Sequence, residues 1–476
     1  MAGLPVRRGR LTDRPAFTPP APELPTGVKQ LLDRLWHSGH AAYVVGGGLR
    51  DQLLGRPAAD WDIATDARPE RIVELFPQGR YENRFGTVTV DGIEATTFRR
   101  DHQYGDHRRP DAVTFTDDVI SDLSRRDFTV NAIAWGRSGH ETDDSLGPDW
   151  VDPSGGLVDL QRRLIRAVGE PARRFDEDAL RLLRAARLSA QLGFEIEPAT
   201  LAGMREAAHL VGHVSAERVG AELGKMLRSE APSRGFALLE ETGLLEPLFP
   251  ELAAQVGLAQ DKIPGHDLWQ HSLLTLDAAA QLDPPNERLR LAALLHDLGK
   301  PTTYAEGRFI GHDIEGARMA AALLARLAWP RREIEPVVAL IAGHMFSYER
   351  RWSDAAVRRF VHRTGRDLVA DQLRLRQADN VGSGLPPDTG HVDELQARVN
   401  AVLREQPALS LAELAVNGRD LMAELQLGPS PLVGELLERL LEIVIERPER
   451  NTRPELLQTA RQIVATRRQA TGGAAP

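Results

Sequence analysis

Between residues 41 and 160, short apolar runs alternate with turn residues, a pattern typical of strands joined by tight turns. Residues 28–40 carry apolar positions at helical spacing and end at Gly39. The run AAYVVGG predicts a buried strand, and RDQLLG predicts a turn of helix closed by Gly55. Strand-like alternation follows in DWDIAT, TVTVDG and IEATTF. We therefore predict a small mixed sheet with flanking helices that ends near DPSGGLVDL (152–160).

From about residue 161 to the C-terminus, Leu, Ala and Arg recur at a spacing of three to four residues, which predicts helices throughout. A His-rich block lies within this region, and SGLPPDTG (383–390) has the composition of a linker. The predicted fold class is α+β. The predicted parts are an N-terminal arm (1–27), a mixed-sheet domain (28–165), a helical neck (166–262), a His-rich helical domain (263–385) and a helical tail (386–476).

The composition is that of a soluble globular protein, with 42% hydrophobic and 27% charged residues. Cysteine is absent, which excludes disulfides, a thiolate nucleophile and Cys-ligated zinc. Residues 1–27 are rich in Arg, Pro and Thr and lack the apolar segment of a signal peptide, so we expect a disordered arm. No run approaches the roughly 18–20 apolar residues that a membrane span needs. We therefore expect a cytoplasmic protein that does not bind membranes.

The net charge of −9 argues weakly against a nucleic-acid partner, but the average conceals two Arg-rich segments, 160–190 and 318–376. Nearly all basic residues are Arg, and Lys occurs only at positions 29, 225, 262 and 300. Genome composition is one explanation of this bias. The other is bidentate contact with phosphate groups, for which Arg is better suited than Lys.

A strand that runs into Gly46, Gly47 and Gly48 before a helix presents backbone N–H groups, which favour phosphate. Asp60 and Asp62 follow at alternate positions of the next predicted strand, so both carboxylates lie on one face. Two neighbouring carboxylates repel each other unless they are solvated or hold a cation. A solvated turn or a calcium-like site is one interpretation. The other is Mg²⁺ held between the aspartates and a triphosphate substrate.

The stretch GGGLRDQLLG…DWDIAT resembles the opening motif of class II tRNA nucleotidyltransferases, the CCA-adding enzymes and their poly(A) polymerase relatives. Four further motifs follow in the order of that family: RRDFTVNA (125–132), DPSGGLVDL (152–160), EDALRLLRAARL (177–188) and SAERVGAELGKML (215–227). The resemblance covers about residues 40–230. It implies template-independent addition of CCA to tRNA from CTP and ATP.

The resemblance also implies roles for individual residues. Asp60 and Asp62 would hold Mg²⁺, and Glu94 would be the third catalytic carboxylate and activate the tRNA 3′-hydroxyl. Asp178 and Arg181, one turn of helix apart, would hydrogen-bond the Watson–Crick edges of C and A. The remaining residues expected to contact the nucleotide are Gly47, Arg50, Arg126, Asp127, Asn131, Arg184 and Arg187.

CCA addition and poly(A) addition share all of these motifs. The segment NRFGTVTV (83–90) is similar to the CCA-adding branch, and RRDHQYGDHRRPDAVTF (99–115) resembles that family's flexible loop, which repositions the base pocket. Poly(A) polymerase or A-only addition is the alternative activity. A non-catalytic RNA-binding protein is an alternative of a different class.

The His-rich block resembles the HD phosphohydrolase superfamily in the order His, His-Asp, Asp. The corresponding residues are His271, His296, Asp297 and Asp379. His312 and His344 match the additional positions of members with two metals, and Lys300 stands where the superfamily often keeps a phosphate-binding residue. Imidazole and carboxylate ligands suit a divalent metal ion. The alternative is a retained fold with a dead site that serves as a tRNA-binding body.

Overall fold

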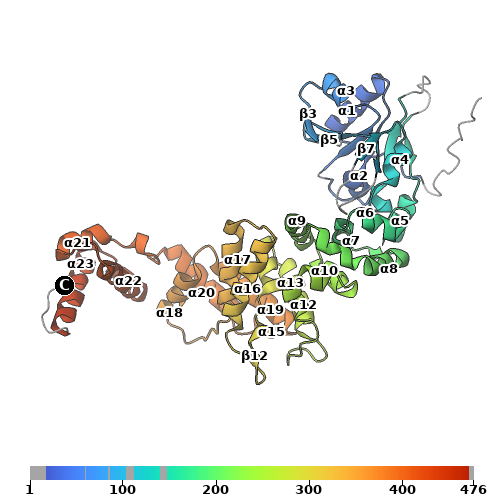
Figure 1. The fold of residues 1–476 in the computed structure, drawn as a ribbon. Coiled ribbons are helices and arrows are strands. Elements are labelled where there is room, and N and C mark those ends of the chain that lie inside the picture. The colour runs from blue at the N-terminus through green and yellow to red at the C-terminus, as the bar shows by residue number, and fades with distance from the viewer. Residues whose placement is uncertain (1–17, 59, 84–85, 103–111, 140–146, 471–476) are drawn as a thin grey trace, which may run out of the picture. The chain divides into compact units, whose positions relative to one another are not determined.

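The computed structural model describes residues 18–58, 60–83, 86–102, 112–139 and 147–470, which form two compact units divided after Pro250 (Figure 1). Most of the predicted N-terminal arm, residues 84–85 of NRFGTVTV and residues 103–111 of the predicted flexible loop lie outside the described residues. The end of the arm packs on the first unit, where the Trp150 indole N–H donates to the Pro19 carbonyl at 2.9 Å. None of the helices in the described ranges is long and apolar enough to cross a membrane.

The first unit is built on a mixed seven-stranded sheet of order β3-β4-β5-β2-β1-β8-β9. All four residues of β1 are buried, which explains its central place in the sheet. Strands β2 and β5 are parallel, and the other neighbours are antiparallel. The strands are β1 Ala42–Val45, β2 Asp62–Thr65, β3 Arg80–Asn83, β4 Thr87–Val90, β5 Ile93–Thr97, β8 Ala134–Arg137 and β9 Asp149–Val151.

Helices flank this sheet, as the sequence predicts. They are α1 Thr26–His37, α2 Gly46–Leu53, α3 Pro69–Leu75, α4 Val119–Ser124 and α5 Gly156–Arg162. Helix α1 ends where Gly39 adopts a left-handed φ of 81°, close to the predicted end. A separate hairpin of β6 Arg99–His102 and β7 Ala112–Phe115 forms the two ends of the segment predicted as a flexible loop (99–115), so these ends are strands.

Helices complete the first unit, again as predicted. Helix α7 (Leu180–Leu192) packs against α9 and α10, because ten of its thirteen residues are buried. The other helices are α6 Pro171–Glu177, α8 Pro198–Glu206, α9 Ala216–Leu227, α10 Pro232–Glu241, α11 Leu245–Leu248 and the 3₁₀ turns Thr129–Asn131 and Ala208–His213. The two-residue strands β10 (Leu164–Ile165) and β11 (Glu195–Ile196) pair beside α7.

The second unit is almost entirely helical. Its first part packs α13 (Leu268–Ala280) against α14 (Glu287–Leu295) and α19 (Val369–Gly382), and α16 (His312–Arg326) against α17 (Arg331–Gly343). A hydrophobic core joins α18 (Asp354–Thr364) to the tail helices, so residues 386–476 share their core with the preceding segment. The remaining elements are α12 Pro250–Ala253, α15 Lys300–Thr303, β12 Tyr304–Ala305, β13 Arg308–Phe309, α20 Val392–Glu405, α21 Gly418–Leu425, α22 Pro431–Glu446, α23 Arg453–Ala470 and the 3₁₀ turns Leu411–Glu413 and Pro448–Arg450.

Candidate active site and metal centre

Three carboxylates lie at the end of the sheet where β2 and β5 begin. Asp62 opens β2 and is paired in register with Glu94 on the parallel strand β5, so both side chains point to the same face. Asp60 lies two residues before β2 and is exposed. Burial raises the pKa of Asp62 to about 6, and the charges of Glu94 and Asp60 add to this rise while Arg126 opposes it. A divalent cation would relieve the repulsion among these groups.

The glycine run lies directly against this cluster. Helix α2 begins at Gly46, so the three glycines form its first turn, whereas the sequence predicted a turn before the helix. A Cβ at Gly48 would lie 2.2 Å from the Asp60 carbonyl oxygen, and one at Gly46 would lie 2.7 Å from Asp62 Oδ2. Glycine is required at both positions because any side chain would push the helix away from the aspartates.

A cleft of about 840 Å³ opens beside the carboxylates. All nine residues predicted to contact the nucleotide line it, together with Asp60 and Asp62. The other lining residues are Gly46, Gly48, Asp51, Pro57, Arg99, Arg125, Gln191, Lys225 and Arg228. Cationic side chains outnumber the carboxylates in this lining, which suits a polyanionic ligand accompanied by a metal ion.

A chain of buried polar contacts crosses the floor of the cleft. Arg50 donates from Nη1 to Asn131 Oδ1 at 2.7 Å, and Asn131 donates from Nδ2 to Asp127 Oδ1 at 3.2 Å. The second oxygen of Asp127 pairs with Arg184 Nη2 at 2.8 Å. Burial alone would raise the pKa of Asp127, but Arg184 and Asn131 outweigh it and hold this pKa below its ordinary value. Asp127 is therefore an ionised residue that fixes the two arginines on either side of it.

Asp178 and Arg181 both line the cleft, but not as two positions on one helix. Asp178 is extended (φ −151°) between α6 and α7, and its Oδ1 accepts the Leu180 N–H at 3.1 Å. The prediction that both residues belong to one helix is therefore wrong, because Asp178 precedes α7. Its main-chain carbonyl still accepts the Arg181 N–H at 2.9 Å, so the two residues remain one turn apart. Asp178 Oδ2 pairs with Arg218 at 2.7 Å, and Arg181 Nη1 pairs with Glu177 Oε2 at 2.6 Å.

Arg187 is held by a partner from α9. Its Nε lies 2.5 Å from Glu222 Oε2, and its Nη1 donates to Gln191 Oε1 at 2.7 Å. Burial lowers the pKa of Arg187, although Glu222 acts in the opposite direction. The α7 arginines are thus anchored by acids from other segments, and their side chains border the cleft in fixed positions.

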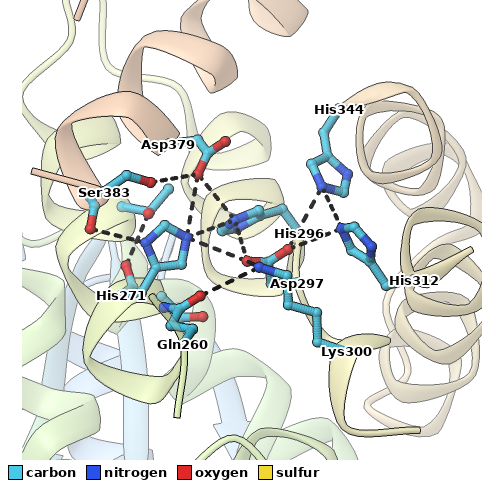
Figure 2. Close-up of polar contacts among 12 residues, drawn as sticks. Gln260, His271, His296, Asp297, Lys300, His312, His344, Asp379 and Ser383 are labelled. Atoms are coloured by element: carbon cyan, nitrogen blue, oxygen red, sulfur yellow. Dashed lines mark hydrogen bonds and ion pairs between the residues drawn. The ribbon is translucent and has the colours of Figure 1, made fainter. Parts of the chain in front are cut away.

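The second unit contains four buried histidines whose Nε2 atoms converge (Figure 2). Each Nδ1 lies within hydrogen-bonding distance of a backbone carbonyl oxygen, which can only accept. Nδ1 therefore carries the hydrogen, and in the neutral ring Nε2 keeps a lone pair that can bind a metal ion, as in metal-ligating histidines. The pairs are His271 with Gly382 (2.9 Å), His296 with Ala293 (2.8 Å), His312 with Phe309 (2.7 Å) and His344 with Ile341 (2.6 Å).

Two candidate metal-binding groups share this centre, one formed by His271, His296 and Asp379 and the other by Asp297, His312 and His344. Asp297 lies between them: its Oδ2 is 3.1 Å from His296 Nε2, and its Oδ1 is 3.3 Å from His312 Nε2. The donor set of imidazole nitrogens and carboxylate oxygens fits a divalent metal in each group, with Asp297 able to bridge both.

Charges within the centre shift its pKa values strongly. Burial would lower the pKa of His296, but the Asp297 and Asp379 carboxylates outweigh it and raise this pKa to about 9. The histidines in turn hold the pKa of both aspartates well below the ordinary value, despite the opposing effect of burial. Lys300 Nζ also lies 2.6 Å from Asp297 Oδ2. The centre opens into a cleft of about 670 Å³ lined by Lys262, Arg308, Phe309, Ile310, Met345, Arg376 and Leu385, among others.

Comparison with known proteins agrees with this arrangement. Residues 42–166 match the poly A polymerase head domain, 193–256 the probable RNA and SrmB-binding site of polymerase A, and 268–382 the HD domain. A CCA-adding enzyme of Limosilactobacillus fermentum is 32% identical over 442 residues, which cover 92% of this chain and 96% of the relative. The chain belongs to the tRNA nucleotidyltransferase family.

Two further relatives refine the comparison. An A-adding tRNA nucleotidyltransferase of Deinococcus radiodurans is 37% identical over 446 residues, 89% of this chain and 93% of that protein. The crystal structure of the Bacillus stearothermophilus CCA-adding enzyme in complex with CTP has a TM-score of 0.65 and 29% identity, and covers 93% of this chain and 98% of that chain. The expectation of a tRNA nucleotidyltransferase, rather than a non-catalytic RNA-binding protein, is confirmed.

Several residues of this tRNA nucleotidyltransferase that border or brace the two sites were not predicted. Glu177 and Glu222 anchor the α7 arginines, and Arg218 pairs with Asp178. Glu177 stands four residues before Arg181, so the spacing of these opposite charges was an available signal, whereas Arg218 and Glu222 pair with residues of other segments. Lys262, which contacts the histidine centre, has no such local signal.

Proposed function

We propose that the chain completes the 3′ end of tRNA by adding CCA from CTP and ATP without a nucleic-acid template. The observation that carries the proposal is the position of Asp60 and Asp62 in the lining of a cleft rich in arginine, with Glu94 paired in register with Asp62. Near-complete matches to CCA-adding and A-adding relatives give the substrate class. We expect the protein to work in the cytoplasm.

We assign Mg²⁺ to the carboxylate cluster. Bound there, it would neutralise charge on the reacting phosphate and orient the 3′-hydroxyl. The 3′-oxygen of the tRNA forms a bond to the α-phosphorus of the nucleoside triphosphate. The bond between this phosphorus and the oxygen that bridges it to the β-phosphorus breaks, and pyrophosphate leaves. Glu94 accepts the hydroxyl proton. Support for these roles comes from the raised pKa of Asp62, which burial causes first and the charges of Glu94 and Asp60 increase.

The cleft offers separate groups for the phosphates and for the base. Arg50 and the N–H groups of the first turn of α2, Gly47 among them, would hold the triphosphate, with Arg126 beside Asp62. Asp178 and Arg181 would present an acceptor and a donor to the base. Asp127 and Asn131 would position Arg50, and Arg184 and Arg187 would border the phosphates.

The contacts of Asp178 and Arg181 make them suitable for reading a base edge. Arg218 and Glu177 hold them by charged contacts of 2.7 and 2.6 Å, so each side chain is pre-oriented before a nucleotide arrives. Cytosine and adenine both present an amino donor beside a ring acceptor. Guanine and uracil present a carbonyl oxygen and an N–H at those places and would leave buried groups unsatisfied.

Addition of A alone is the second candidate, favoured by the 37% identity to the Deinococcus radiodurans A-adding enzyme. The experiment that separates the two uses tRNA lacking all three terminal nucleotides and tRNA ending in CC, each with CTP, ATP or both. We expect both substrates to be completed to CCA. An enzyme that extends only the CC-ending tRNA would overturn CCA addition in favour of A addition.

We also propose that the HD centre binds divalent metal ions and hydrolyses phosphomonoesters or 2′,3′-cyclic phosphates. Four histidines with correctly oriented Nε2 atoms and two ionised aspartates support metal binding, and Lys300 supports phosphate binding. Purified protein supplied with Mn²⁺ should hydrolyse p-nitrophenyl phosphate or 2′,3′-cyclic AMP. Equal turnover by an Asp297→Ala variant would show that the activity does not belong to this centre.

A further inference from the structure

Two of the four lysines in this Arg-rich chain end among the ligands of the HD centre. Nearly every other basic side chain is Arg, so a lysine at this place is notable. An ammonium is a compact point charge, whereas a guanidinium is a planar fork that needs more room. The space between imidazole rings and carboxylates therefore favours lysine.

Lys262 lies at the ligands of the first metal-binding group. Its Nζ is 3.0 Å from His271 Nε2, 3.2 Å from Asp379 Oδ1 and 3.9 Å from Asp297 Oδ2. A metal ion bound to His271 Nε2 at about 2.1 Å would lie within about 5 Å of this ammonium. This limit is the sum of the metal–nitrogen distance and the distance from Lys262 Nζ to His271 Nε2. The lysine and the metal ion thus compete for the same lone pairs.

The carboxylates of the HD centre have cationic partners within the protein itself. Its two carboxylates, Asp297 and Asp379, face the ammonium groups of Lys262 and Lys300, and Arg376 Nη1 lies 3.4 Å from Asp379 Oδ2. Buried carboxylates need such partners. A dication would add to this local excess of positive charge, which is unfavourable unless one of the cations moves away.

Lys262 is the cation best placed to move. It lies in the loop between α12 and α13, and its side chain is 27% exposed and borders the open cleft. Lys300 is only 9% exposed, lies over the Phe309 ring and is fixed at 2.6 Å from Asp297. Withdrawal of Lys262 into the cleft would free His271 and Asp379 without disturbing a helix.

We propose that Lys262 is a built-in counter-cation of the metal-free HD centre, and that a divalent metal ion must displace it from His271 and Asp379. Lys262 thereby weakens metal binding and keeps the buried ligands in place when no metal is bound. This inference rests on the proposed metal binding by the HD centre. It goes further because it names Lys262 as the residue that sets the affinity of the HD centre for a divalent metal ion.

The test measures binding of Mn²⁺ by calorimetry to the full chain in an Asp60→Ala, Asp62→Ala background, so that only the HD centre is read. Replacing Lys262 with Met keeps the length of the side chain and removes its charge. We expect Lys262→Met to bind Mn²⁺ at least about ten-fold more tightly, because a nearby positive charge is gone. Lys262→Arg keeps the charge and should not bind more tightly, and Lys29→Met on α1 should match the parent.

Each outcome decides the matter. Tighter binding by Lys262→Met but not by Lys262→Arg supports the inference. Equal or weaker binding by Lys262→Met, with an unchanged melting temperature, overturns it and leaves the metal site intact. Absence of Mn²⁺ binding in parent and variants alike would instead overturn the proposed HD metal site, and the inference with it.

Discussion

Replacing Asp62 with Asn should stabilise the metal-free protein at neutral pH, although it removes a proposed catalytic group. Burial and the charges of Glu94 and Asp60 raise the pKa of Asp62 from 3.8 to about 6. The folded state therefore keeps a proton that the unfolded state loses between these two values. Stability falls as the pH rises through this window, and the loss is complete above about pH 6.

The pKa values set the size of the effect. A rise from 3.8 to about 6 corresponds to about 3 kcal/mol of unfavourable free energy at pH 8 and to about half of that at pH 5. Solvent screening reduces these figures, so we expect Asp62→Asn to raise the free energy of unfolding by about 1–3 kcal/mol at pH 8. For a unit of this size the gain corresponds to a rise in melting temperature of about 3–10 °C.

The assay is differential scanning calorimetry of parent and variant in EDTA at pH 5, 6.5 and 8. Asp33→Asn, at an exposed position of α1, is the matched control and should leave the melting temperature unchanged. Mg²⁺ should stabilise the parent and reduce the difference, because it neutralises Asp62. A variant that is no more stable than the parent at pH 8 without metal would refute the raised pKa of Asp62 and the buried, acidic environment that causes it.

Three further predictions concern base selection and the HD centre. Asp178→Ala and Arg181→Ala should each lose selectivity among the four nucleoside triphosphates by about 1–3 kcal/mol per contact, measured by competition on tRNA that lacks CCA; a variant that still excludes UTP and GTP as strictly as the parent would place base reading elsewhere. Asp297→Ala should lose metal by elemental analysis while nucleotide addition continues, and unchanged metal content would argue against the site. Because the Asp297 and Asp379 carboxylates, against the effect of burial, raise the pKa of His296 to about 9, metal binding must expel its proton. Mn²⁺ affinity should therefore rise between about pH 6.5 and 9, with a calorimetric heat that depends on the buffer, and a flat pH profile would contradict this charge state.

The sequence was most informative where function depends on short, ordered motifs. The sequence predicts the mixed sheet, the helical remainder and the nucleotide contacts, and the residues that its motifs supply line one cleft. The six predicted HD ligands also come together. The order of these histidines and aspartates along the chain carries this information, although the residues are far apart in the sequence.

Details that depend on packing were harder to predict. The glycines form the first turn of α2 and not a turn before it. Their close approach to Asp60 is a contact between two segments, which the sequence of one strand does not reveal. The sequence predicts Asp178 within a helix, but the residue lies just before α7 and accepts the Leu180 N–H, as an aspartate before an apolar run often does. Contacts such as Lys262 with Asp379 join residues far apart in the chain, and a single sequence does not pair them.

The most direct test of the central claim compares nucleotide addition with tRNA binding in an Asp60→Ala variant. We expect the rate of nucleotide addition to tRNA to fall by about a thousand-fold or more, since metal-supported charge neutralisation is worth several kcal/mol. Affinity for tRNA, measured by filter binding, should stay within about two-fold of the parent, because an exposed carboxylate contributes little attraction to a polyanion. A variant that retains turnover close to that of the parent would contradict the assignment of catalysis to this carboxylate cluster.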